Sequence, residues 1–171
     1  VVAFEGFKSG VKATLDDGTG EIILLLWQDL YDALPAPRAL DVGAEVAVEG
    51  EVSVYEDVLE IIPAAPEDIE VLVGAAAPPW VDAGALTEAD VGRIVRLRGV
   101  LKRPEAFSAG VKVPLDDGTG TVTVLLWSNI AADLSPAPEA GLPVEVTGEV
   151  ALYRGAFELI PRSSYDWRAA E

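Results

Sequence analysis

Apolar and polar residues alternate in short runs along most of the chain, and the same succession of runs occurs twice. Residues 10–27 and 110–127 are identical at 12 of 18 positions without a gap. In each copy a strand pattern leads into Asp-Asp-Gly-Thr-Gly and then into a more apolar strand that ends in Trp27 or Trp127. A period of two is typical of strands with one solvated face, and Asp-Gly favours a tight hairpin turn. The pattern therefore predicts a repeated, all-β architecture.

Three further elements follow the hairpin in the same order in both copies. They are a short helix ended by prolines, a long strand and a last strand. In the first and second copy they cover, respectively, 28–34 and 128–134, 46–55 and 144–153, and 59–63 and 157–161. A glycine in the middle of the long strand, Gly50 or Gly148, predicts a bend or bulge there.

The second copy begins with a segment that the first copy lacks. Residues 91–100 alternate apolar and basic side chains and predict a first strand, whereas the first copy starts at the counterpart of residue 101. We therefore expect a truncated first strand and, because the sequence also has no methionine, an excerpt of a longer polypeptide. The stretch rich in Ala and Pro between the copies predicts a linker. The expected organisation is a first domain over 1–73, a linker over 74–86 and a second domain over 87–171.

The residue types narrow the possible chemistry. The sequence contains no cysteine and no histidine, which excludes disulfides, thiolate metal sites, and the commonest general base and zinc ligand. The repeated Asp pairs are explained by the turn that Asp-Gly forms, rather than by a metal loop. No apolar run reaches the roughly 18 residues that a membrane helix needs. We therefore expect a soluble, non-enzymatic protein without cofactor, metal or membrane insertion. Its compartment, cytoplasmic or exported, stays open.

Charge is distributed unevenly along the chain. The formal net charge is −17, which opposes the binding of polyanions. Residues 1–80 hold 3 basic and 16 acidic side chains, whereas residues 81–171 hold 9 basic and 13 acidic ones. An anion-binding surface is therefore expected mainly in the second half.

Three motifs of the second copy together resemble a known superfamily. They read Val-Gly-x-x-Val-x-Leu-x-Gly-Val over 91–100, Leu-Asp-Asp-Gly-Thr-Gly-x-Val-x-Val-x-x-Trp over 115–127, and Val-x-Val-x-Gly-x-Val-x-x-Tyr over 144–153. They are similar to the OB-fold nucleic-acid-binding superfamily, in particular to anticodon-binding and helicase-type modules, which are also found attached to bacterial nucleases. The resemblance implies two tandem five-stranded Greek-key barrels, each with a short helix between strands 3 and 4.

The resemblance also implies where a ligand lies. In that superfamily the ligand crosses the second and third strands between two loops, where cations meet phosphates and aromatic rings stack on bases. In the second copy this face comprises Lys102, Arg103, Phe107, Lys112, Thr123, Trp127, Tyr153 and Arg154. In the first copy it comprises Lys8, Lys12, Ile23, Trp27 and Tyr55. The first copy has Glu56 and Asp57 where the second has Arg154 and Gly155, which weakens the expectation for the first copy.

The tryptophans and the basic run also have structural interpretations. A tryptophan that ends an apolar strand packs under the adjoining helix more often than it binds a ligand, so core packing is favoured for Trp27 and Trp127. Trp167 is expected to pack in the core, and Trp80 to hold the linker on a barrel or between domains. The basic run over 93–103 is interpreted first as a solvated strand face balanced by nearby acids.

We therefore expect a non-catalytic tandem module that binds single-stranded DNA or RNA weakly, mainly through its second copy. The alternative is a structural or protein–protein interaction module of a larger, possibly exported, protein, with the other domains of that polypeptide as partners. Oligosaccharide binding, which OB-folds also perform, has no positive sign beyond tryptophan and acidic residues.

Overall fold

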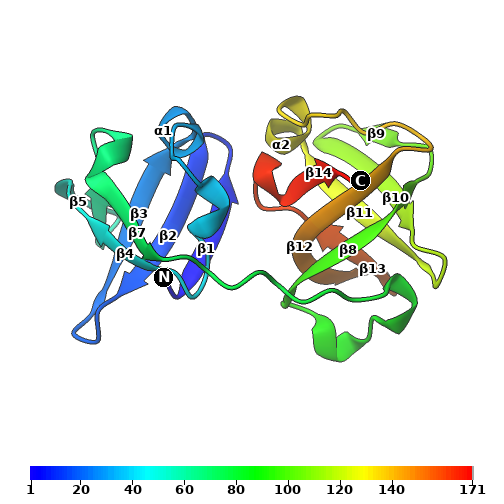
Figure 1. The fold of residues 1–171 in the computed structure, drawn as a ribbon, viewed down its shortest axis with the longest axis horizontal. Helices are drawn as coiled ribbons and strands as arrows, with labels where there is room; N and C mark the ends of the chain where they lie inside the picture. Colours follow the sequence, from blue (N-terminus) through cyan, green and yellow to red (C-terminus); the bar gives the residue numbers. More distant parts are fainter. Residues whose placement is uncertain (171) are drawn as a thin grey trace. The chain divides into compact units, whose positions relative to one another are not determined.

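The computed structural model describes residues 1–170, which form two compact units (Figure 1). The first unit covers Val1–Ala77 and the second begins at Pro78. Residues 78–86, expected to be linker, belong to the second unit, because Ala83 and Leu86 are buried in its core. The prediction of a mostly β protein is confirmed.

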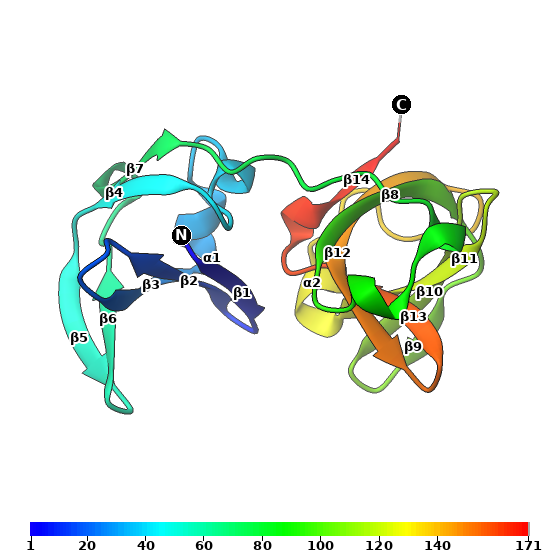
Figure 2. The same cartoon turned by 90° about the horizontal axis from the view of Figure 1, so that it is seen from below.

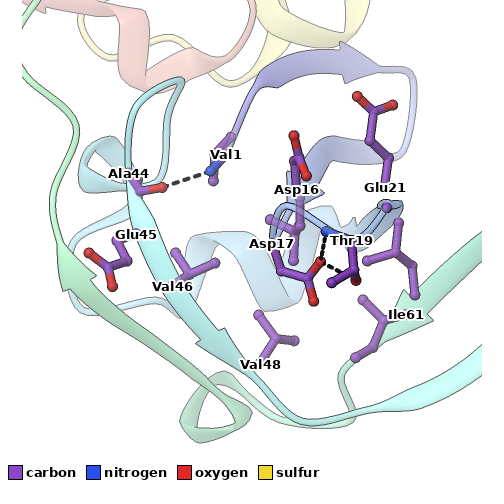
Figure 3. Close-up of a pocket in the computed structure, with 13 residues that line it drawn as sticks. Val1, Asp16, Asp17, Thr19, Glu21, Ala44, Glu45, Val46, Val48 and Ile61 are labelled. Carbon is purple, nitrogen blue, oxygen red and sulfur yellow. Dashed lines mark hydrogen bonds between the residues drawn. The ribbon is translucent and has the colours of Figure 1, made fainter.

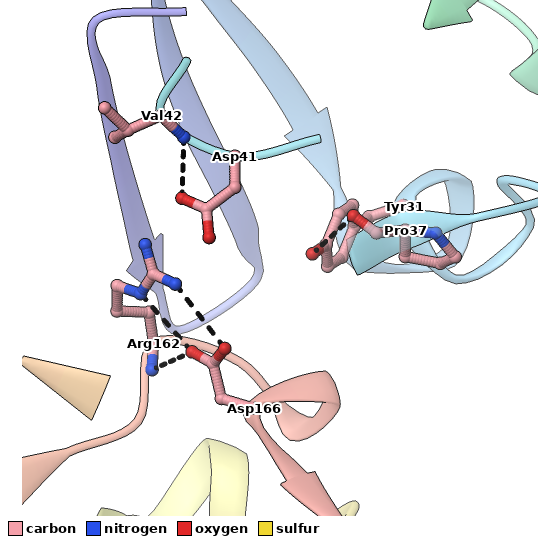
Figure 4. Close-up of polar contacts among 6 residues, drawn as sticks. All are labelled: Tyr31, Pro37, Asp41, Val42, Arg162 and Asp166. Atoms are coloured by element: carbon pink, nitrogen blue, oxygen red, sulfur yellow. Dashed lines mark hydrogen bonds and ion pairs between the residues drawn. The ribbon is translucent and has the colours of Figure 1, made fainter. Parts of the chain in front are cut away.

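The first unit contains two separate sheets. Its elements are β1 (Ala3–Phe7), β2 (Gly10–Asp16), β3 (Glu21–Trp27), α1 (Gln28–Asp32), β4 (Glu45–Val48), β5 (Glu51–Tyr55), β6 (Val58–Ile62) and β7 (Ile69–Val73), with 3-10 turns at Pro37–Ala39 and Pro66–Asp68. One sheet has the order β1-β2-β3-β6-β5, and β4 pairs with β7 in the other. The hydroxyl of the buried Tyr31 in α1 donates to the carbonyl oxygen of Pro37 at 3.3 Å (Figure 4).

The strands of the second unit pair in a closed ring. Its elements are β8 (Ile94–Leu101), β9 (Glu105–Phe107), β10 (Gly110–Asp116), β11 (Thr121–Trp127), α2 (Ser128–Ala132), β12 (Pro143–Tyr153), β13 (Ala156–Ile160) and β14 (Trp167–Ala169), with 3-10 turns at Ala83–Ala85, Glu88–Asp90 and Ser164–Asp166. β8 pairs with β10 and β12, β10 with β11, β11 with β13 in parallel, and β13 with β12 (Figure 2). This is the strand order of an OB-fold.

The inside of the ring is filled by alternate residues of its strands. Val95 and Leu97 of β8, Val113 of β10 and Val146 of β12 are fully buried. Trp167 is also buried, and its indole Nε1 donates to the carbonyl oxygen of Pro136 at 2.9 Å, so its predicted packing role is confirmed. An ion pair just before it, between the Nε of Arg162 and the Oδ2 of Asp166 at 3.3 Å, stabilises the turn that leads into β14 (Figure 4).

The repeated Asp-Asp-Gly-Thr-Gly forms the predicted hairpin turn in both units. Gly18 and Gly118 have φ angles of 85° and 86°, a backbone conformation that glycine adopts readily and that residues with a side chain disfavour. In the first unit the Asp17 carboxylate accepts hydrogen bonds from both the backbone and the hydroxyl of Thr19, at 2.8 and 2.6 Å (Figure 3). The turn interpretation of the Asp pairs is therefore confirmed.

The long strand predicted over 46–55 is interrupted in the first unit. β4 ends at Val48 and β5 begins at Glu51, whereas β12 runs unbroken through Gly148. In the second unit β8 pairs with β12 across this point, and the first unit has no counterpart of β8. In the first unit β4 and β5 belong to different sheets.

Among the described residues, no helix has the length and apolar character needed to cross a membrane.

Candidate nucleic-acid interface

Two aromatic rings lie side by side at one end of the second unit's outer face. Gly110 of β10 pairs with Phe107 on one side and with Trp127 on the other. With no side chain between them, the two rings meet edge to face at a centroid distance of 6.2 Å. Trp127 is 41% exposed and its counterpart Trp27 is 49% exposed, so the favoured interpretation of core packing under the helix was wrong for both.

A second group on this face surrounds Tyr153, which is 49% exposed. The Lys112 Nζ lies 4.8 Å from the centre of its ring and the Arg154 guanidinium 5.2 Å from it, both within the range of a cation–π interaction. The same Lys112 Nζ lies 2.6 Å from the Oε1 of Glu158, a buried carboxylate of β13. The ring therefore stands beside two cations: Arg154, which has no ion pair among the described residues, and Lys112, which is already neutralised by Glu158.

Strand register joins the two groups into one surface. Lys112 follows Gly110 by two residues along β10 and thus shares its face. Thr123, four residues before Trp127, lies directly opposite Glu158. The outer face therefore brings together Phe107, Lys112, Thr123, Trp127 and Tyr153.

Lys102 and Arg103 lie in the connection between β8 and β9, and both are exposed. The Lys102 Nζ lies 2.9 Å from the Oδ2 of Asp116. The hydrogen bond from Lys102, together with one from the Gly118 backbone, lowers the pKa of the Asp116 carboxyl. Lys102 is therefore partly neutralised as well.

The basic run that precedes this connection is balanced by neighbouring groups, as its structural interpretation predicted. Arg93 pairs with Asp90, and both Arg98 and Arg168 pair with Glu145. Arg96 instead stacks its guanidinium 4.4 Å from the centre of the Trp80 ring, and its Nε donates to the carbonyl oxygen of Pro78 at 2.6 Å. Trp80 thus holds the start of the second unit on β8, one of its two predicted roles.

The first unit repeats the same contacts in a more acidic setting. Phe7 and Trp27 meet edge to face at 5.9 Å. The Lys12 Nζ lies 2.9 Å from the buried Glu60 Oε1 and 5.9 Å from the centre of the Tyr55 ring.

The β5–β6 turn sets the first unit apart. It carries Glu56 and Asp57 where the second unit has Arg154. Lys8 is exposed in the β1–β2 turn, and Ile23 is half-buried.

Sequence reasoning missed the two buried glutamates, Glu60 and Glu158, that hold the lysines. The signal was present: each is the one charged residue inside an otherwise apolar strand. A charge buried in such a strand requires a partner. Among the described residues, no group of three acidic side chains could hold a metal ion.

No protein-family model matches the chain. Over 70 residues it is 37% identical to the Exodeoxyribonuclease 7 large subunit of Rhodospirillum centenum (strain ATCC 51521 / SW), a match that covers 40% of the chain. The chain spans 13% of the length of that subunit.

Solved structures give further partial likenesses. A Replication Protein A heterotrimer bound to ssDNA matches at a TM-score of 0.38 and 18% identity, over 46% of this chain and 57% of the other. The S. pombe Stn1-Ten1 complex matches at 0.38 and 20%, over 46% and 58%. Asparaginyl-tRNA synthetase from Pyrococcus horikoshii matches at 0.44 and 19%, over 54% and 23%.

Proposed function

We propose that the chain is a non-catalytic module of two tandem OB-fold barrels, the first truncated, that binds single-stranded nucleic acid. The observation that supports this function is the gathering of exposed rings and cations on one sheet face of the second unit. We call this group the aromatic–cation face; it consists of Phe107, Lys112, Trp127, Tyr153 and Arg154. Such rings stack on bases of any sequence while the cations meet phosphates.

The second unit is the better site because of its β12–β13 turn. Arg154 makes a cation–π contact with Tyr153 and no ion pair among the described residues, so its charge is available to a phosphate. At the same place the first unit has Glu56 and Asp57, whose negative charges repel a phosphate.

Binding is expected to be weak. Lys112 and Lys102 already face carboxylates, and the whole chain carries a net charge of −17. Each phosphate neutralised on a single strand contributes roughly 0.7 to the dependence of log K on log salt. With Arg154 and two or three partly neutralised cations, we expect a slope of about −1 to −2.

Fluorescence anisotropy with labelled oligo-dT and oligo-rU at low salt tests the proposal. We expect a Kd of about 10–100 µM, typical of binding without sequence preference. Tyr153→Ala removes one stacking platform and should weaken binding about tenfold, whereas Tyr55→Ala, its counterpart in the first unit, should have little effect. Absence of binding by both oligomers, or equal losses in the two variants, would contradict the proposal.

A further inference from the structure

Three arginines gather on the outer side of β8, β12 and β14 in the second unit. Arg98 of β8 lies directly opposite Glu145 of β12, which in turn lies opposite Arg168 of β14. Arg96 precedes Arg98 by two residues along β8 and therefore shares its face. We call Arg96, Arg98 and Arg168 the arginine cluster.

Among the described residues, a single carboxylate pairs with this cluster. Glu145 is 7% exposed and uses both of its oxygens: Oε1 accepts a hydrogen bond from the Nε of Arg98 at 2.9 Å, and Oε2 accepts one from the Nε of Arg168. Arg96 contacts a ring and a carbonyl oxygen instead of a carboxylate. Three cations therefore share one buried anion, in a chain whose net charge is −17.

The protein holds each guanidinium in place and leaves part of it accessible. The centre of the Trp80 ring lies 4.4 Å from the guanidinium carbon of Arg96 and 5.8 Å from that of Arg98. The Nε of Arg96 also donates to the carbonyl oxygen of Pro78 at 2.6 Å. The side chains of Arg98 and Arg168 nevertheless stay 56% and 52% exposed. A cation that is already fixed loses little side-chain entropy when it binds a phosphate.

The outer side of β8 leads from the arginine cluster to the aromatic–cation face. Beyond Arg98 it reaches the exposed Lys102, and the exposed Arg103 follows in the connection to β9. Arg96 and Lys102 are six residues apart, about 20 Å along an extended strand. β9 then carries Phe107 of the aromatic–cation face. Cations therefore line the whole distance between the two groups.

We propose that the arginine cluster is a second contact for the single strand that binds the aromatic–cation face. The inference rests on the proposed function for its ligand and adds phosphate contacts on other strands of the barrel. The nucleic-acid backbone leaves the aromatic–cation face beside Lys102, follows β8 and places two phosphates on the arginine cluster. Arginine suits this role because its planar guanidinium can donate two parallel hydrogen bonds to one phosphate.

The test compares a labelled five-nucleotide oligo-dT with a fifteen-nucleotide one on the whole chain, because an OB barrel contacts about 4–16 nucleotides. Anisotropy titrations at several salt concentrations give log K against log salt for each. We expect the slope of the longer oligomer to be steeper by up to about 1.4, roughly 0.7 for each of two further phosphates. The larger number of equivalent positions on a longer oligomer raises its affinity but leaves this slope unchanged.

The two oligomers separate this proposal from the proposed function. Equal salt slopes would overturn the second contact and leave the aromatic–cation face as the whole site. Failure of both oligomers to bind would overturn the proposed function and this inference together.

Arginine variants locate the contact. Arg168→Gln leaves Glu145 with its other arginine, and Arg96→Gln removes a cation that has no carboxylate partner among the described residues. Each should weaken the longer oligomer about two- to fivefold, the size expected for an exposed ion pair. Binding of the shorter oligomer should stay unchanged, which also shows that the barrel is folded. Arg93→Gln is the matched control, because the equally exposed Arg93 has Asp90 as its own partner.

Three results would overturn the proposal. Equal losses in Arg93→Gln and in the two cluster variants would mean that the overall charge of the chain is responsible. Equal losses for the short and the long oligomer would mean that the arginines act on the aromatic–cation face. If poly-glutamate displaced the longer oligomer as well as unlabelled oligo-dT of equal charge, the cluster would be a site for acidic polypeptides instead.

Discussion

The ammonium of Lys112 lies 2.6 Å from the buried carboxylate of Glu158, and the first unit repeats the pair with Lys12 and Glu60 at 2.9 Å. Both lysines were expected to meet phosphates. The structure instead gives each of them a carboxylate partner inside the sheet face, which stabilises the lysine in place next to a tyrosine ring. A ligand phosphate must compete with that carboxylate.

Replacing Glu158 by Gln should strengthen oligonucleotide binding. The change keeps the side-chain shape but removes the negative charge beneath Lys112, so the lysine becomes available to a phosphate. We expect the Kd to fall about threefold or more at low salt and the salt slope to steepen by up to about 0.7. Anisotropy titrations measure both. Glu60→Gln in the first unit is the matched control, and weaker binding by Glu158→Gln would show that Lys112 is not part of the site.

The different burial of Val150 and Val52 predicts different costs for the same substitution. Val150→Ala leaves a cavity in a closed core and should lower the free energy of unfolding of the second unit by about 2 kcal/mol. Val52 is 58% exposed, so Val52→Ala should cost less than about 0.5 kcal/mol. Hydrogen exchange measures the free energy of unfolding of each unit separately. Equal costs would mean that Val52 is covered in solution.

Asp117 should contribute more to the stability of the second unit than its counterpart Asp17 contributes to that of the first. Both accept hydrogen bonds from the threonine two residues later, but the Asp117 Oδ2 also accepts one from the backbone of Ala83 at 2.6 Å. Asp117→Ala should therefore destabilise its unit by about 1–2 kcal/mol more than Asp17→Ala destabilises the first, because a partly buried N–H loses its acceptor. Urea unfolding monitored unit by unit measures the difference, and equal effects would rule out a structural role for the Ala83 contact.

Glu145 should make the second unit sensitive to acid. Hydrogen bonds from Arg98 and then Arg168 lower the pKa of its carboxyl, against the effect of burial. A lowered folded-state pKa adds stability that is present above the ordinary glutamate pKa of about 4.3 and is lost as the pH falls below it. The stability difference between the natural chain and Glu145→Gln should therefore shrink between about pH 5 and pH 3. Thermal unfolding over this range tests the expectation; a constant difference would contradict it.

Local patterns were sufficient for the elements that depend on neighbouring residues. The Asp-Gly turns, the short helices after Trp27 and Trp127 and the inward packing of Trp167 follow from turn chemistry, periodicity and the apolar match with Ile69. The glycine pattern predicted a bend at both Gly50 and Gly148, but it did not tell the two units apart. β12 continues through Gly148, where it pairs with β8, whereas β4 and β5 are separate strands. Strand pairing joins residues far apart in the sequence.

The sequence by itself determined that the protein is a β-rich repeat and that its cations lie mainly in the second half. Tertiary structure decided which side of each strand is covered. Leu125 and Trp127 share one face of β11, yet one is buried and the other exposed. It also decided that Lys112 meets Glu158, 46 residues away. A period of two assigns side chains to faces, but only the packing of distant strands decides which faces water reaches.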